Sequence, residues 1–220
     1  MAMQLDLGDG VVGVDGRHFA PVYGPMSREP TPANRVAAVV LAAGESRRFG
    51  SPKQLARFGD RTLLERVLDV AAEAGLKPIV AVVPAWLTPP AGADQGIHWI
   101  RNAEPQRGMS HSLQLGFAAL GVEVGAAVVL LGDQPGLPAT SIASVIDRRG
   151  SRPIVAGWHD GHPIPPVLVE RRKFTVVAET RGDAGLREIL QGLGDDVTRV
   201  ELPASPDIDT QADLERLGAP

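Results

Sequence analysis

Apolar runs rich in β-branched residues recur along the chain and alternate with helical patterns. The runs at 36–42, 78–83 and 126–131 are almost wholly apolar, and glycine or proline follows each of them closely. A strand that is apolar at successive positions is buried on both faces, which is typical of a parallel sheet covered by helices. Helical spacing of apolar residues appears between the runs, as at 63–74. These patterns predict a three-layer, mostly parallel α/β domain.

The remaining elements are placed by capping and turn residues. The capping box Thr62-x-x-Glu65 predicts the start of the first helix, and Gly75 its end. The proline-bearing segment at 159–170 is expected to be irregular. Further strands are expected at 97–101, 153–158 and 197–202, and further helices at 108–120, 138–149, 171–179, 183–191 and 210–217.

Composition excludes several classes of function. The chain has 220 residues, a net charge of −4 and no cysteine. The length suits one core domain. The negative net charge argues against electrostatic binding of nucleic acid along the whole chain. The lack of cysteine excludes disulfides and thiolate chemistry. No apolar run approaches the ~20 residues that span a membrane, and the N-terminus does not resemble a secretory signal. We therefore expect a cytoplasmic protein with no nucleic-acid or membrane partner.

Residues 1–34 differ from the rest of the chain. Short apolar fragments there are broken by Asp9-Gly10 and Asp15-Gly16, and Pro25, Pro30 and Pro32 mark the approach to residue 34. This pattern is typical of an extension followed by a linker. We expect residues 1–34 to be an N-terminal extension and 35–220 to be the domain. A strand pair that binds a partner is the alternative.

The loop after the first strand, Gly44–Lys53, combines small residues with cations. Backbone N–H groups can approach phosphate oxygens closely where side chains are small, and Arg48 and Lys53 can neutralise their charge. No Walker motif and no dinucleotide fingerprint is present. The alternative is a surface loop whose basic residues are solvated.

A second polar loop, Gly132-Asp133-Gln134-Pro135, follows the apolar strand at 126–131. Ligands of open parallel sheets bind at the carboxyl ends of the strands, so both loops lie at the ligand-binding edge. Asp133 suits Mg²⁺, which takes one or two carboxylates together with substrate phosphates. Alternatively, Asp133 caps a helix or forms a turn.

Two further segments carry polar groups. A glycine-led helix start at Gly108 offers unpaired N–H groups, with Ser110 and Ser112 as short donors, so a nucleotide base or ribose is expected there. A serine-capped helix is the alternative. Near the C-terminus, Asp207 and Asp209 precede a helix that Thr210 could cap, which by itself explains acidic residues at this position.

The segment LAAGESRRFGSPK, residues 41–53, resembles the N-terminal signature of the MobA-like nucleotidyltransferases, and the closest branch is the molybdenum cofactor cytidylyltransferases. The segments at 102–116, 132–135, 182–187 and 207–214 are similar to other motifs of that family. The resemblance covers residues 36–217. It implies a Rossmann-like fold of the nucleotide-diphospho-sugar transferase type.

The resemblance also implies roles for individual residues. Arg48 and Lys53 would stabilise the triphosphate and the leaving pyrophosphate. Asp133 and Asp209 would bind Mg²⁺, with Asp207 competing for the role of Asp209. Arg187 would face the phosphate of the acceptor, or else lie on a helix surface. The residues expected to contact the nucleotide or cofactor are Leu41, Ala42, Ala43, Gly44, Lys53, Asn102, Gly108, Ser110, Ser112 and Arg187.

The implied reaction is Mg²⁺-dependent transfer of a nucleoside monophosphate to a phosphorylated acceptor with release of pyrophosphate. Leu-Ala-Ala-Gly, where relatives that use GTP have Leu-Ala-Gly-Gly, favours CTP. The implied acceptor is molybdopterin, and a molybdoenzyme or its chaperone is a further implied partner. The segment Gly161–Val169 departs from the family's Gly-His-Pro-Val-Leu pattern, so the acceptor stays open.

Three alternatives are kept: a guanylyltransferase, a sugar-phosphate nucleotidyltransferase, and a carrier that holds a nucleotide or pterin cofactor without turnover. Lys53 together with two candidate metal carboxylates argues against the carrier, which would not need them.

Overall fold

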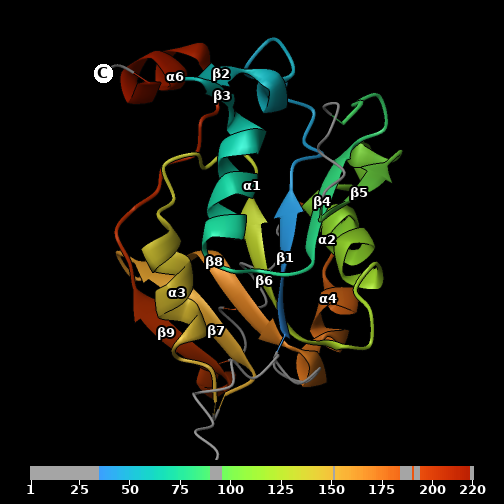
Figure 1. The fold of residues 1–220 in the computed structure, drawn as a ribbon, viewed down its shortest axis with the longest axis vertical. Helices are drawn as coiled ribbons and strands as arrows, with labels where there is room; N and C mark the ends of the chain where they lie inside the picture. The colour runs from blue at the N-terminus through green and yellow to red at the C-terminus, as the bar shows by residue number, and fades with distance from the viewer. Residues whose placement is uncertain (1–34, 90–95, 151, 184–189, 191–193, 219–220) are drawn as a thin grey trace, which may run out of the picture.

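A seven-stranded sheet forms the centre of the computed structural model, which describes residues 35–89, 96–150, 152–183, 190 and 194–218 (Figure 1). The strand order is β5-β4-β1-β6-β8-β7-β9, and only β8 is antiparallel to its neighbours. The predicted mostly parallel, Rossmann-like α/β fold is confirmed. The strands are β1 (Arg35–Leu41), β4 (Ile79–Pro84), β5 (Ile97–Asn102), β6 (Val124–Leu131), β7 (Ile154–His159), β8 (His162–Glu170) and β9 (Val197–Glu201), and a small hairpin pairs β2 (Arg57–Phe58) with β3 (Arg61–Thr62).

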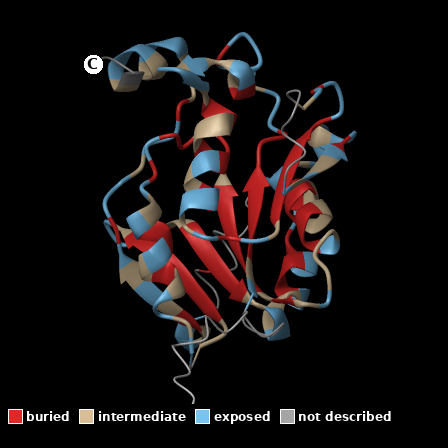
Figure 2. Ribbon diagram, viewed as in Figure 1, coloured by how far each residue is buried: buried red, intermediate tan, exposed pale blue. Residues whose placement is uncertain are grey.

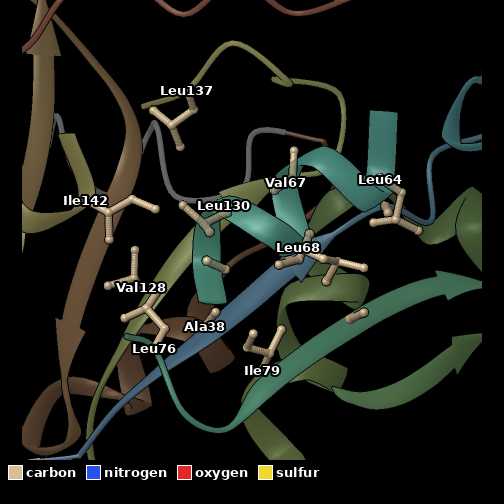
Figure 3. Close-up of a cluster of buried hydrophobic side chains, with 14 of the residues drawn as sticks. Ala38, Leu64, Val67, Leu68, Leu76, Ile79, Val128, Leu130, Leu137 and Ile142 are labelled. Atoms are coloured by element: carbon tan, nitrogen blue, oxygen red, sulfur yellow. The ribbon is translucent and has the colours of Figure 1, made fainter. Parts of the chain in front are cut away.

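Helices cover both faces of this sheet. On one face, α1 and α3 contribute Leu64, Val67 and Ile142 to a buried cluster, which Figure 3 shows against the strands. On the other face, α2 and α4 contribute Leu113 and Val177 to a second cluster. The central strands β1, β4 and β6 are almost wholly buried (Figure 2), as their continuous apolar sequences require. The helices are α1 (Leu63–Glu73), α2 (Met109–Ala118), α3 (Ala139–Ile146), α4 (Thr175–Glu179) and α6 (Gln211–Gly218).

The start of α1 follows the predicted capping box. The Thr62 hydroxyl accepts a hydrogen bond from the Glu65 N–H at 3.2 Å, and the Glu65 carboxylate accepts one from the Thr62 N–H at 2.8 Å. Two N–H groups that the helix itself leaves unpaired are thereby satisfied. The helix ends before Gly75, whose φ of +75° suits a residue without a side chain.

The expectation of an irregular segment at 159–170 is wrong, because His162–Glu170 forms β8 between β6 and β7. The apolar half, Val167–Glu170, pairs with β6 on one side and lies along β7 on the other. The proline-bearing half pairs with β7 alone, through His162–Ile164. Prolines donate no ladder hydrogen bond and are tolerated where one side of a strand is unpaired. The pairing with β6 therefore stops where the prolines begin.

A third apolar cluster ties the C-terminal segment to the first loop. Phe49 from the loop after β1, Leu63 from the start of α1 and Ile208 from the C-terminal segment are all buried together. Figure 1 shows α6 and the β2–β3 hairpin at the end of the molecule toward which β1 and β6 point. Ile208 is thus held beside the carboxyl ends of the central strands. No helix among the described residues is long and apolar enough to span a membrane.

Candidate active site

The two loops predicted to meet at the sheet edge do meet. β1 and β6 are parallel neighbours with Leu41 opposite Leu131, so the chain leaves both strands at the same level. A hydrogen bond of 2.9 Å from the Gly132 N–H to the Leu41 carbonyl continues the ladder past the strand ends. An added Cβ at Gly132 would lie 2.7 Å from the Ala42 Cβ, so only glycine allows this approach. A cavity of about 350 Å³ opens here, which we call the central cavity.

Acidic and basic side chains meet in the central cavity. The Lys53 Nζ lies 2.6 Å from Asp133 Oδ2 and 3.1 Å from Asp209 Oδ1. The Arg48 guanidinium lies 2.8 Å from the other oxygen of Asp209. Three distant parts of the sequence thus supply four charges to one place. Each of these four predicted site residues also lines the cavity.

Lys53 stays protonated in this environment. Burial by itself lowers the pKa of an ammonium group, but the charge of Asp133 and the hydrogen bonds to Asp133 and Asp209 outweigh it. The pKa of Lys53 is therefore raised above its ordinary value. A lysine that keeps its charge can neutralise phosphate oxygens at any physiological pH.

The carboxylates fit a divalent metal ion that phosphate oxygens help to bind. Within the described part of the chain, Asp133 Oδ1 is buried and has no hydrogen-bond partner. Such an orphaned oxygen, beside Asp209, offers the hard ligands that Mg²⁺ or Mn²⁺ prefers. Among the described residues, no group of three or more histidine, cysteine or acidic side chains is placed to hold a metal ion. A divalent ion bound here would take one or two carboxylates from these residues and would need substrate oxygens to complete its coordination.

Asp207, the competing candidate, has a different environment. Its Oδ1 accepts a hydrogen bond of 2.7 Å from the Gln134 side-chain amide. Burial, reinforced by the charge of Asp133, raises the pKa of Asp207. Between the two acids, Ile208 is fully buried and its N–H donates to the Asp133 carbonyl at 2.9 Å. This anchor fixes both Asp207 and Asp209 beside the loop that carries Asp133.

Gln54 is a site residue that sequence reasoning missed. Its side-chain amide donates to the carbonyls of Ala42 and Gly44 at 2.8 and 2.7 Å. The side chain is only 3% exposed. These two hydrogen bonds therefore fix the conformation of the small-residue loop, and Gln54 directly follows Lys53 in the sequence. Adjacency to the motif was the only available signal, because a single glutamine carries no spacing pattern.

The predicted residues around α2 do not all line the central cavity. Asn102 is fully buried; its amide donates to Ser112 Oγ at 2.9 Å, and its carbonyl oxygen accepts from the Glu104 N–H. These bonds fix the loop before α2. Gly108 and Ser112 line the central cavity, whereas the Ser110 N–H donates to the carbonyl of Gly182. Arg187 lies outside the described residues.

Further hollows adjoin the central cavity, and two of them differ in chemistry. One, of about 460 Å³, is lined by the loop after β1, Asn102 and Trp86, and we call it the tryptophan hollow. The other, of about 310 Å³, is walled by apolar residues of β1, β6, β8 and α2, and we call it the apolar hollow. Asp183 and Asp207 are the polar side chains among the described residues that line the apolar hollow. The site is thus a charged centre with two arms of different chemistry.

Comparison with known proteins gives consistent results. A family described as MobA-like NTP transferase domain matches residues 38–198. The bifunctional protein GlmU of Gloeobacter violaceus is 36% identical over 121 residues, which are 53% of this chain and 26% of that protein. The chain thus spans about a quarter of the length of this curated relative.

Solved structures match over nearly their full length. A homologue of Rv0371c from Mycobacterium sp. strain JC1 superposes with a TM-score of 0.71 at 30% identity, covering 86% of this chain and 96% of that one. Rv0371c from Mycobacterium tuberculosis, in a complex with manganese, gives a TM-score of 0.68 at 26% identity, covering 83% and 97%.

Proposed function

The chain belongs to the MobA-like NTP transferase family, and on this premise we propose that it is a nucleotidyltransferase. In the proposed reaction, an oxygen of the acceptor phosphate attacks the α-phosphorus of a nucleoside triphosphate. The bond from the α-phosphorus to the bridging oxygen breaks, and pyrophosphate leaves with that oxygen. The observation that carries the proposal is the meeting of Lys53 with Asp133 and Asp209 in one cavity.

The residues of the chain act by positioning and charge. Lys53 and Arg48 neutralise the triphosphate and the negative charge that develops on the leaving pyrophosphate. Small residues at 42–44 let the phosphates approach the main chain. Such chemistry needs no covalent nucleophile, since in-line geometry and charge stabilisation lower the barrier. The protein would thus bring two anions together that repel each other in water.

We further propose Mg²⁺ as the metal, held by Asp133 and Asp209. When bound, a divalent ion neutralises and orients phosphate oxygens. The buried, unpaired Oδ1 of Asp133 supports this assignment. Manganese in the structure of Rv0371c supports a divalent ion in a related protein.

For the substrates, we propose CTP and molybdopterin. The Leu41–Gly44 sequence favours CTP through the resemblance described above. The apolar hollow supports an acceptor that carries a flat ring system as well as a phosphate. The phosphate would reach the charged centre, and the apolar face of the ring system would pack against the carbon atoms that line the hollow. Pro163 and Pro165 line this hollow and lack N–H groups, so apart from Asp183 and Asp207 the wall offers few partners for the hydroxyls of a sugar phosphate. Burying such hydroxyls unpaired would be costly.

The test is pyrophosphate release with Mg²⁺ and CTP, GTP or ATP in turn. Each nucleotide is assayed alone, with molybdopterin, and with a hexose 1-phosphate. Release with CTP that requires molybdopterin is the expected result. Release with the sugar phosphate would replace the proposed acceptor, and release with GTP the proposed nucleotide. Absence of release and of nucleotide binding would overturn the transferase assignment.

A further inference from the structure

Trp86 is a large aromatic side chain left exposed beside the charged centre. It follows β4, the strand next to β1, and is 55% exposed. By contrast, Trp158 is buried, and the Trp99 side chain packs partly buried against the core. Exposing a tryptophan to water forgoes the free energy that burial would provide. Its position at the carboxyl end of a central strand makes ligand contact a physical reason for this exposure.

The tryptophan hollow adjoins the central cavity. Both are lined by Ala43, Gly44, Glu45 and Pro105. The far wall consists of Trp86 and the end of β5, and the near wall of the loop that carries the cations. A nucleotide whose phosphates lie on Lys53 and Arg48 can therefore extend into this hollow. Its volume of about 460 Å³ is within the range of small-molecule sites.

The two arms of the site differ in what they offer a nucleobase. A base needs a flat face to stack on and hydrogen-bonding groups at its edge. In the tryptophan hollow, Trp86 offers a flat face for stacking. Small residues such as Gly50 and Ser51 leave main-chain groups accessible for hydrogen bonds to the edge of the base. Among the described residues that line the apolar hollow there is no aromatic ring. The base is thus better matched to the tryptophan hollow.

We propose that the Trp86 indole is the stacking surface for the nucleobase of the bound nucleoside triphosphate. This inference rests on the proposed function. Indole has a large π-face, and base–aromatic stacking contributes substantially to binding while tolerating any base. Trp86 therefore sets the affinity for the base, and the loop groups at its edge set which base is preferred. Nothing in the stacking itself distinguishes CTP from GTP.

The test compares ligands with and without a base. Dissociation constants for CTP and for inorganic tripolyphosphate, both with Mg²⁺, are measured by calorimetry for the full-length protein and three variants. Trp86→Ala should weaken CTP binding about 10-fold to 100-fold, because a stacked base is lost, and leave tripolyphosphate binding unchanged. Trp86→Phe, which keeps an aromatic face, should bind CTP within about threefold of the wild type. Val122→Ala is the matched control, since Val122 is 92% exposed and is not among the residues lining the three cavities.

Each other outcome counts against the proposal. Unchanged CTP binding by Trp86→Ala would overturn it. Equal loss of CTP and tripolyphosphate binding would also overturn it, since Trp86 would then shape the phosphate loop and not contact a base. If the wild type binds tripolyphosphate but not CTP, the stacking site is wrong while the phosphate site stands. If it binds neither ligand, the proposed function fails and this inference fails with it.

Discussion

At the residue scale, Lys53 is the charged residue at the centre of the site. Its ammonium group bridges Asp133 and Asp209, and its side chain is only 15% exposed. Partly buried charges tolerate poorly the loss of a partner, because the remaining charge has little water around it. The same three charges are also those that phosphate and metal would engage. Structural and chemical roles therefore coincide at this residue.

The first prediction concerns Asp133→Asn. The amide keeps the size and shape of the side chain but removes the negative charge that Lys53 and a divalent ion need. We expect pyrophosphate release to fall by about 100-fold to 1000-fold. The thermal midpoint should stay within a few degrees of the wild type, because Lys53 keeps Asp209 as a partner. Steady-state assays and circular dichroism measure the two. Asp147→Asn, at an exposed aspartate that follows α3, is the control and should change neither value; equal activity of the two variants would refute the assignment.

The second prediction concerns Gln54→Leu. Leucine fills the volume but leaves the carbonyls of Ala42 and Gly44 without their donor. Leaving buried carbonyls unpaired should lower the free energy of unfolding by about 1–3 kcal/mol, which urea titration measures. The loosened loop should also raise KM for the nucleotide. Gln211→Leu, at an exposed glutamine that begins α6, should leave both quantities unchanged, and equal effects at both sites would remove Gln54 from the site.

The sequence predicted the charged residues of the site better than the residues that support them. Asp133 could be placed by chemistry alone, because a carboxylate directly after a buried strand lies at the ligand-binding edge. Lys53 could likewise be placed at this edge, because it ends a loop of small residues and cations after the first strand. Asp209 depended on the resemblance, since nothing local shows that positions so far apart meet. Gln54 and Trp86 were missed because a lone glutamine and a lone tryptophan have no spacing pattern. The hydrogen bonds of Gln54 and the exposed position of Trp86 beside the site appear only in the three-dimensional structure.

At the element scale, α1 has the clearest sequence signal of the helices, and its start contributes to the stability of the fold in a way that depends on pH. Glu65 accepts the Thr62 N–H at the start of α1, and this hydrogen bond is the main cause that lowers the pKa of its carboxyl group below 4.5. A carboxylate with a lowered folded-state pKa stabilises the fold above its unfolded pKa. That contribution is lost as the pH falls through the folded-state value.

The third prediction follows from the lowered pKa of Glu65. Glu65→Gln keeps an oxygen that can accept the hydrogen bond but removes the charge near the helix N-terminus. The wild type should exceed this variant by about 0.5 kcal/mol in the free energy of unfolding near pH 7, and the difference should vanish as the pH falls below 4.5. Chemical denaturation across this range measures it. A difference for Glu65→Gln that grows in acid would refute the prediction.

Elements with continuous apolar sequences were predicted closely, whereas β8 was missed. The runs that became β1, β4 and β6 are buried on both faces and contain no interior proline. In β8, prolines occupy three of the first five positions, a pattern that ordinarily argues against a strand. The strand forms because its apolar second half pairs with β6 and continues the two cores. Tertiary packing overrides the local signal there.

At the scale of the whole molecule, both large apolar clusters lie on the faces of one sheet. We propose residues 35–220 as the domain, because the family match begins at residue 38 and the residues before 35 are broken by Asp-Gly turns and prolines. The boundary has a direct thermodynamic consequence.

The fourth prediction is that a chain of residues 35–220 folds and works like the full chain. Its thermal midpoint should lie within about 3 °C of the full-length value, because a loss of 1 kcal/mol shifts the midpoint by roughly 2–4 °C for a domain of this size. Pyrophosphate release should be unchanged. Calorimetry and the release assay test the two statements separately. A markedly lower midpoint would show that residues 1–34 belong to the folded unit.

The proline-bearing half of β8 also bears on how copies of this protein behave in a crowded solution. His162–Ile164 pairs with β7, while the pairing with β6 extends only from Val167 to Glu170. A half-paired strand would ordinarily invite a strand from another molecule to complete its ladder. Here Pro163, Pro165 and Pro166 present no N–H groups, so an intruding strand would find too few donors to bind. The prolines thus leave few N–H donors for a strand of a second molecule, and Pro163 and Pro165 line the apolar hollow instead.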